Sequence, residues 1–110
     1  MRVGFTELHA GNEPAARRLV ARVERATGAR AELSGGPLER QLARLEEGEL
    51  DLVIGEFASD SPWRASVTSV EPLATRRVGA RVVELAPAVR NGENRWVALV
   101  EREVRDGRGQ

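Results

Sequence analysis

The segment DLVIGEFASDSPWR, residues 51–64, joins an apolar run to a polar loop. Leu52, Val53 and Ile54 are uninterrupted apolar residues, which is typical of a strand that is covered on both faces. The run stops at Gly55, and the loop beyond it carries hydroxyls, carboxylates and one guanidinium. Open α/β sheets hold ligands where a strand ends in such a loop. The segment therefore predicts a central strand with a binding loop at its carboxyl end.

Two strand–helix pairs precede this strand. A short strand over residues 1–6 leads to a helix that stops at Gly28, and a second strand over residues 29–33 leads to a helix between Pro37 and Gly48. Alternating strands and helices predict a parallel sheet with right-handed crossovers. The favoured order places the first strand between the second and the third.

The carboxyl ends of the first and third strands then meet where the sheet reverses direction, which is the usual ligand crevice. We expect Thr6 and Glu7 on one side of this crevice, and Glu56 and Phe57 on the other.

The rest of the chain closes the sheet. Residues 67–73 predict a weak strand, residues 74–79 a polar link, and residues 81–88 a strand with Pro87 at its edge or end.

A last helix is expected from about Glu93 to Val104, with Trp96 in its core stripe and residues 105–110 as a frayed tail. The whole chain, residues 1–110, thus predicts a single three-layer α/β domain. Its sheet is expected to be mainly parallel, with about five strands and helices on both faces.

Composition narrows the function classes. The 110 residues are 41% hydrophobic and 31% charged, so a packed core is expected. Lys+Arg and Asp+Glu both number 17, a balance that disfavours nucleic acid as a partner. The chain has no cysteine, no apolar run long enough to span a membrane and no visible secretory leader after Met1.

Catalytic motifs are absent from the sequence. There is no phosphate-binding glycine loop, nucleophile elbow or zinc motif, and the single histidine is His9 in a loop. We therefore expect no enzyme, no cofactor and no metal. Two alternatives stay open: an enzyme that depends on His9, and a divalent-cation site built from Glu7, His9, Glu56 and Asp60.

Residues 38–73 resemble the first lobe of family 3 extracellular solute-binding proteins, the amino-acid-binding components of ABC importers. The matching features are a helix that ends at Gly48, a D-x-V-I-G strand over residues 51–55, the loop Ser-Pro-Trp-Arg over residues 61–64, and a strand that ends in Pro-Leu at residues 72–73. The last helix resembles the one that packs on this lobe. The short connection from Leu73 to Arg81 stands where a full member inserts its second lobe.

The resemblance implies a ligand site. In that family the loop arginine holds the ligand carboxylate through its planar fork, helped by a threonine hydroxyl. By position Arg64 takes the arginine role and Ser61 replaces the threonine, while Ser59 adds a hydroxyl or N–H group and Trp63 an apolar wall. The full expected ligand set is Thr6, Glu7, Glu56, Ser59, Ser61, Trp63 and Arg64.

The same residues have plainer interpretations. Arg64 also fits a surface ion pair with Asp60 or Glu71, and Trp63 fits packing on a neighbouring strand. The expected function is a module that binds a small polar, amino-acid-like solute weakly or serves a membrane transporter as an accessory. The alternative is a homo-oligomeric assembly protein that has lost ligand binding and dimerises through the face that lobe 2 would cover. The resemblance implies periplasmic residence, and the sequence leaves cytoplasmic residence open.

Overall fold

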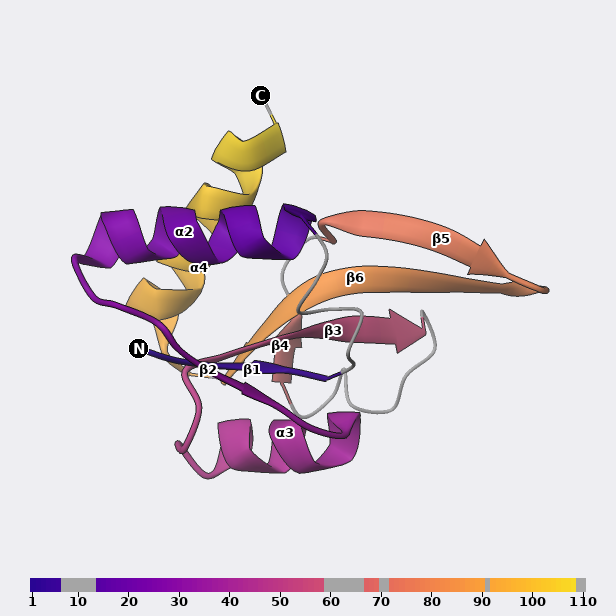
Figure 1. Cartoon of the computed structure of the whole chain (residues 1–110), viewed down its shortest axis with the longest axis horizontal. Coiled ribbons are helices and arrows are strands. Elements are labelled where there is room, and N and C mark those ends of the chain that lie inside the picture. The colour runs from indigo at the N-terminus through magenta and orange to yellow at the C-terminus, as the bar shows by residue number, and fades with distance from the viewer. Residues whose placement is uncertain (7–13, 59–66, 70–71, 91, 109–110) are drawn as a thin grey trace.

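A mixed β-sheet with helices on both faces forms the centre of the computed structural model (Figure 1). The structure describes residues 1–6, 14–58, 67–69, 72–90 and 92–108. In this part of the chain the six strands have the order β2-β1-β3-β6-β4, and β5 also pairs with β6. The strands are β1 Arg2–Phe5, β2 Glu32–Gly35, β3 Leu52–Ala58, β4 Val67–Ser69, β5 Ala74–Val78 and β6 Arg81–Arg90. The helices are α2 Pro14–Thr27, α3 Leu38–Glu46 and α4 Asn94–Arg108.

The N-terminal half of the sheet is parallel, and it confirms the predicted strand order. β1 lies between β2 and β3, and Phe5 is in register with both Gly35 and Ile54. β2 begins at Glu32, so the predicted strand over residues 29–33 was placed too early. The reason is local, because the N–H of Ala31 donates to a carboxylate oxygen of Glu24 at 2.8 Å instead of entering a ladder.

The C-terminal half of the sheet is antiparallel, because β6 pairs with β3, β4 and β5 in that sense. The predicted polar link over residues 74–79 is wrong: Ala74–Val78 forms β5, a strand joined to β6 by a two-residue turn. Gly79 opens that turn with φ 62°, the pattern of a type II′ hairpin. The weak strand predicted over residues 67–73 exists as β4, which covers only Val67–Ser69.

Pro87 was expected at the edge or end of its strand, and this is wrong. It is buried inside β6 and in register with Ile54 of β3. On the other side of β6, the ladder to β4 starts at Ala88 and the ladder to β5 stops at Leu85. Pro87, which has no N–H group, therefore lies between the β4 and β5 ladders, at a position where neither ladder needs a hydrogen-bond donor from β6.

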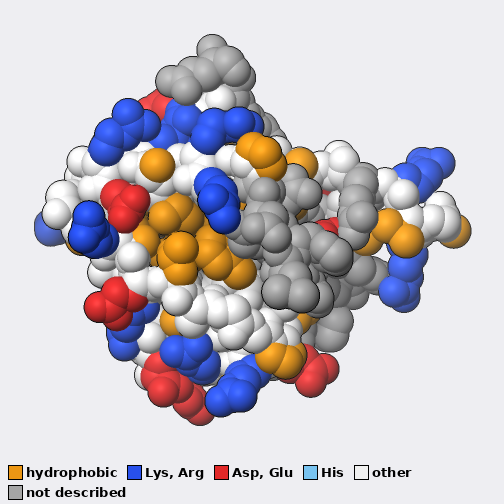
Figure 2. Space-filling view, in the orientation of Figure 1, with side chains coloured by type: hydrophobic (Ala, Val, Ile, Leu, Met, Phe, Trp, Pro, Cys, Tyr) orange, Lys and Arg blue, Asp and Glu red, His pale blue; other side chains and the backbone are white. Residues whose placement is uncertain are grey.

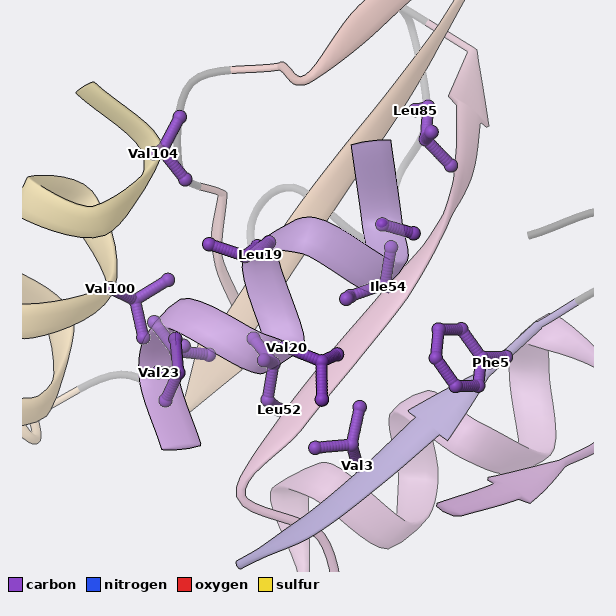
Figure 3. Packing of buried hydrophobic residues seen from close by; sticks show 12 residues of the cluster. Val3, Phe5, Leu19, Val20, Val23, Leu52, Ile54, Leu85, Val100 and Val104 are labelled. Atoms are coloured by element: carbon purple, nitrogen blue, oxygen red, sulfur yellow. The ribbon is translucent and has the colours of Figure 1, made fainter. Parts of the chain in front are cut away.

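Two apolar clusters hold the three layers together, which confirms the predicted three-layer α/β class. One lies between the sheet and helices α2 and α4, and Figure 3 shows its labelled side chains converging from the strands and from both helices. The other lies between the sheet and α3, with Leu42, Leu45, Val53 and Phe57 among its members. Strand alternation assigns the odd and even residues of β3 to different clusters, so this strand is covered on both faces as predicted.

The helix ends follow the sequence pattern closely. Gly28 and Gly48 adopt positive φ just after α2 and α3, as expected of helix stops. α4 continues to Arg108, so residues 105–108 are helical and not part of a frayed tail. None of the helices in the described ranges is long and apolar enough to cross a membrane.

Candidate functional site

The carboxyl end of β1 lies beside the middle of β3, because Phe5 is in register with Ile54 and β3 continues to Ala58. Thr6 marks this edge of the sheet. Its N–H donates to the carbonyl of Ile54 at 3.2 Å, which extends the β1–β3 pairing by one bond. Its side chain is buried, with only 3% of the residue exposed. Within the described part of the chain, the Thr6 hydroxyl has no hydrogen-bond partner. A buried hydroxyl without a partner costs about 1–3 kcal/mol, so this group calls for a physical reason.

Gly55 makes room for Thr6. A Cβ atom at position 55 would lie 2.2 Å from Oγ1 and 2.5 Å from Cγ2 of Thr6. No real side chain tolerates such contacts, so only glycine allows the threonine to lie over β3 here. The glycine that ends the apolar run therefore has a packing role at the candidate site.

Gln41, a residue of α3, fixes the neighbouring strand ends by hydrogen bonds. Its amide nitrogen donates to the carbonyls of Phe5 at 3.2 Å and Ser34 at 3.1 Å, and the residue is 1% exposed. Arg44 in turn donates to Gln41 Oε1 at 3.0 Å and to the Ser34 hydroxyl at 3.2 Å. This network ties the ends of β1 and β2 to α3 directly beside Thr6.

Glu56 lies near this edge but on the other face of the sheet. It alternates with Gly55, so it shares the α2 and α4 side with Leu52 and Ile54, and it is half-buried. Thr6 lies over Gly55 on the α3 side. The predicted end of the central strand at Gly55 is wrong, because Glu56 and Phe57 pair with β6 and the strand continues to Ala58. Thr6 directly follows β1 as predicted, and the side chains of Thr6 and Glu56 lie on different faces of the sheet.

The remaining predicted site residues lie outside the described residues. They are Glu7, Ser59, Ser61, Trp63 and Arg64, together with His9 and Asp60 of the alternative cation site. Among the residues that the structure does describe, no group of three or more His, Cys, Asp or Glu side chains could hold a metal ion.

At the opposite ends of these strands, Asp51 links the start of β3 to β1 and to α4. Its carboxylate accepts from the N–H of Arg2 at 2.7 Å, and its own N–H donates to the Arg2 carbonyl at 2.8 Å. The indole N–H of Trp96 donates to the Asp51 carbonyl at 2.7 Å. Trp96 is half-buried against the α2/α4 cluster, consistent with the core role expected for it. These contacts give this edge a structural role.

A second feature lies where α2 meets α4. Arg22 is 9% exposed, and it lies 4.0 Å from a carboxylate oxygen of Glu103. A Cβ atom at Gly107 would come within 3.0 Å of the guanidinium carbon of Arg22. These three residues line a cavity of ≈ 130 Å³. Because the buried charge already faces an opposite charge, we interpret the pair as a structural link between the helices.

Sequence reasoning missed Gln41 and Gly55. Gln41 lies three residues after Leu38 and four before Leu45, on the apolar side of its helix. A polar residue at such a position must find a buried partner, and this spacing was the available signal. Gly55 was predicted to end the strand but lies inside it, and its packing role was missed because its close neighbour Thr6 is distant in sequence.

Comparison with solved structures identifies the fold of this chain, whereas comparison of its sequence identifies no family. No family model matches the sequence, and no curated protein matches it. Among solved structures, the substrate-binding protein of an amino acid ABC transporter has a TM-score of 0.81 at 9% identity, over 99% of this chain and 93% of that chain. A mutant of the arginine-bound form of domain 1 from TmArgBP has a TM-score of 0.78 at 12% identity, over 100% of this chain and 92% of that one.

A third solved structure, the ancestral cationic amino acid solute-binding protein AncCDT-1, has a TM-score of 0.76 at 10% identity. It is matched over 99% of this chain and 90% of its own. All three neighbours are named as binding proteins and not as enzymes. At these identities the likeness concerns the fold, and it agrees with the resemblance seen in residues 38–73. The chain has the fold of a single lobe of an amino-acid solute-binding protein.

Proposed function

We propose that this chain is a solute-binding module that holds a small polar solute of the amino-acid type at the carboxyl ends of β1 and β3. The observation that carries the proposal is the buried Thr6 hydroxyl, which lies at this edge without a partner among the described residues. A polar group of a bound solute, reached after rotation of the threonine side chain, would satisfy it. The edge is also where open α/β sheets bind ligands.

The loop after β3 completes the proposed site. The resemblance assigns the ligand carboxylate to Arg64, with Ser59, Ser61 and Trp63 around it. Glu7 follows Thr6 in the sequence, and its negative charge suits the ammonium or side-chain cation of an amino acid, whereas Glu56 lies on the other face of the sheet. Two solved neighbours are named for arginine and for cationic amino acids, and this supports arginine as the first solute to test.

We expect the affinity to be low. β5 and β6 are joined by a two-residue turn, so no second lobe is inserted between them to close over the solute. Ligands that are covered on one side only bury less surface and bind more weakly. We therefore propose a module that binds such a solute weakly or serves a membrane transporter as an accessory, and the resemblance of residues 38–73 is the ground for expecting it in the periplasm.

The proposal is tested by a thermal-shift screen against arginine, other amino acids, polyamines and small carboxylates. A solute at a hundred times its dissociation constant should add about 2.7 kcal/mol to the unfolding free energy. For a domain of this size each kcal/mol raises the midpoint by about 4–8 °C. Arg64→Ala should abolish the shift, whereas Arg40→Ala, at an exposed position on α3, should leave it intact.

Thr6→Val supplies an independent check, because valine keeps the shape and removes the hydroxyl. We expect the solute-free variant to be more stable by about 1 kcal/mol, since the unpartnered group is gone. We also expect its solute-induced shift to be smaller than that of the parent chain.

The absence of any shift in the parent chain would refute the solute-binding proposal. It would then favour the alternative, an assembly protein without a ligand, and sedimentation over a range of concentrations would test that alternative.

A further inference from the structure

The β5–β6 hairpin extends beyond the rest of the sheet. β3 pairs with β6 only as far as the Ala58–Val83 position, whereas β5 pairs with β6 out to Val78 and Arg81. In the described part of the chain, the tip residues of β6 therefore have ladder partners in β5 alone. We call residues 74–83 the arm. Figure 1 shows the arm reaching one end of the longest axis of the molecule.

The arm carries exposed apolar side chains. Val78 is 51% exposed and Val82 is 39% exposed. Among the described residues, the only other large hydrophobic side chain with such exposure is Leu33, at 61%, on the opposite edge strand β2. Figure 2 shows apolar and basic side chains gathered on the arm at one end of the molecule.

The two valines lie on opposite faces of the hairpin. Val78 is in register with Arg81, and Val82 is in register with Arg77, so each face presents one valine beside one exposed arginine. A partner that packed on one face would contact a single valine. A partner that receives the tip end-on would contact both valines and both arginines.

The charge of the arm is one-sided. Its sequence, ATRRVGARVV, contains three arginines and no aspartate or glutamate, although the whole chain is formally neutral. The nearest carboxylate along the strand belongs to Glu84, which is half-buried at the base of the arm. The tip is thus a local basic site on a balanced protein, and it suits an anionic partner.

We propose that the tip of the arm binds the surface of an anionic lipid membrane. Guanidinium groups bind lipid phosphates, and exposed valines gain free energy where the partner offers an apolar layer beneath its charge. A projecting tip reaches a flat surface before the rest of the molecule does. Nucleic acid would satisfy the arginines but would give the valines no apolar layer, and an acidic protein would need a pocket that encloses both faces of the tip to receive both valines. This inference is independent of the proposed solute site.

The test is co-sedimentation of the full chain with vesicles. Vesicles of equimolar phosphatidylglycerol and phosphatidylcholine should bind the protein, and vesicles of phosphatidylcholine alone should not. Each arginine near an anionic surface contributes about fivefold in affinity. The double variant Arg77→Gln with Arg81→Gln should therefore bind roughly 25-fold more weakly. The double variant Val78→Ser with Val82→Ser should also lose most of its binding.

Matched controls lie elsewhere on the surface. Arg40→Gln with Arg95→Gln removes the same charge from exposed positions on α3 and α4, and Leu33→Ser removes a more exposed apolar side chain. These control variants should bind vesicles as the parent does. Equal losses in controls and arm variants would overturn the proposal, and so would equal binding to neutral vesicles.

A spectroscopic readout locates the contact. Because the chain has no cysteine, an environment-sensitive dye can be placed at Ala80→Cys on the turn and, as a control, at the exposed Ala98→Cys on α4. Anionic vesicles should shift the emission of the first label to the blue and leave the second unchanged. The membrane assignment would be contradicted if the protein bound duplex DNA as tightly as anionic vesicles and if the valine substitutions left that DNA binding unchanged.

Discussion

The two ends of strand β6 lie in different surroundings. At its base, Leu85 to Val89 are all buried, and side chains from both helical layers cover them. At its tip, Arg81 and Val82 are exposed and pair only with β5 among the described strands. The same strand thus begins as a solvated ribbon and ends as part of the core. Apolar burial, and not strand pairing itself, separates the stable part of this sheet from the part that is free to meet a partner.

The largest effect on stability is expected from a substitution beside the buried base of β6. Ile54 is fully buried in the α2/α4 cluster and in register with Pro87. Ile54→Ala should lower the unfolding free energy by about 2–5 kcal/mol, because it removes buried methyl groups and leaves a cavity. Urea unfolding followed by circular dichroism measures this loss.

The control for Ile54→Ala is Val78→Ala at the tip, which should cost less than about 1 kcal/mol. Comparable losses at the two positions would mean that the tip is also packed.

A second, smaller effect is expected at Gly55. The alanine methyl of Gly55→Ala would stand 2.2 Å from the Thr6 hydroxyl, so the threonine or the strand must move. We expect a loss of about 1–3 kcal/mol. Gly35→Ala is the matched control, because a Cβ atom at Gly35 meets no neighbour within 4 Å. Equal stability of the two variants in thermal unfolding would show that Thr6 does not lie over Gly55 as described.

The contrast between buried and exposed strand segments also explains which elements the sequence could predict. The buried strand Leu52 to Ile54 is an apolar run whose pattern reflects covering layers, so its place in the sheet follows from the sequence. β5 was missed because four of its five residues are small, polar or charged, and its pairing with β6 makes it a strand. Pro87 was misplaced because the gap between β4 and β5 is a tertiary feature.

The candidate site was predicted only in outline. Thr6 follows β1 as expected, but Glu56 lies inside β3, and the side to which each points depends on register. The hydrogen bonds from Gln41 to the carbonyls of Phe5 and Ser34 depend on how α3 crosses the ends of β1 and β2, and residue spacing does not specify this crossing.

The smallest effect is the sharpest test, since one substitution can be made at both ends of β6. Val82→Thr keeps a β-branched side chain at an exposed position, so stability should change by less than about 0.5 kcal/mol. Val89→Thr places the same hydroxyl at a position that is 0% exposed and should cost about 1–3 kcal/mol. Both variants have the same composition, so their difference in urea midpoint reports the surroundings alone. A substantial cost at Val82 would mean that the tip is already covered in solution by another copy of the chain. The cost would then increase with protein concentration, because dissociation would be coupled to unfolding.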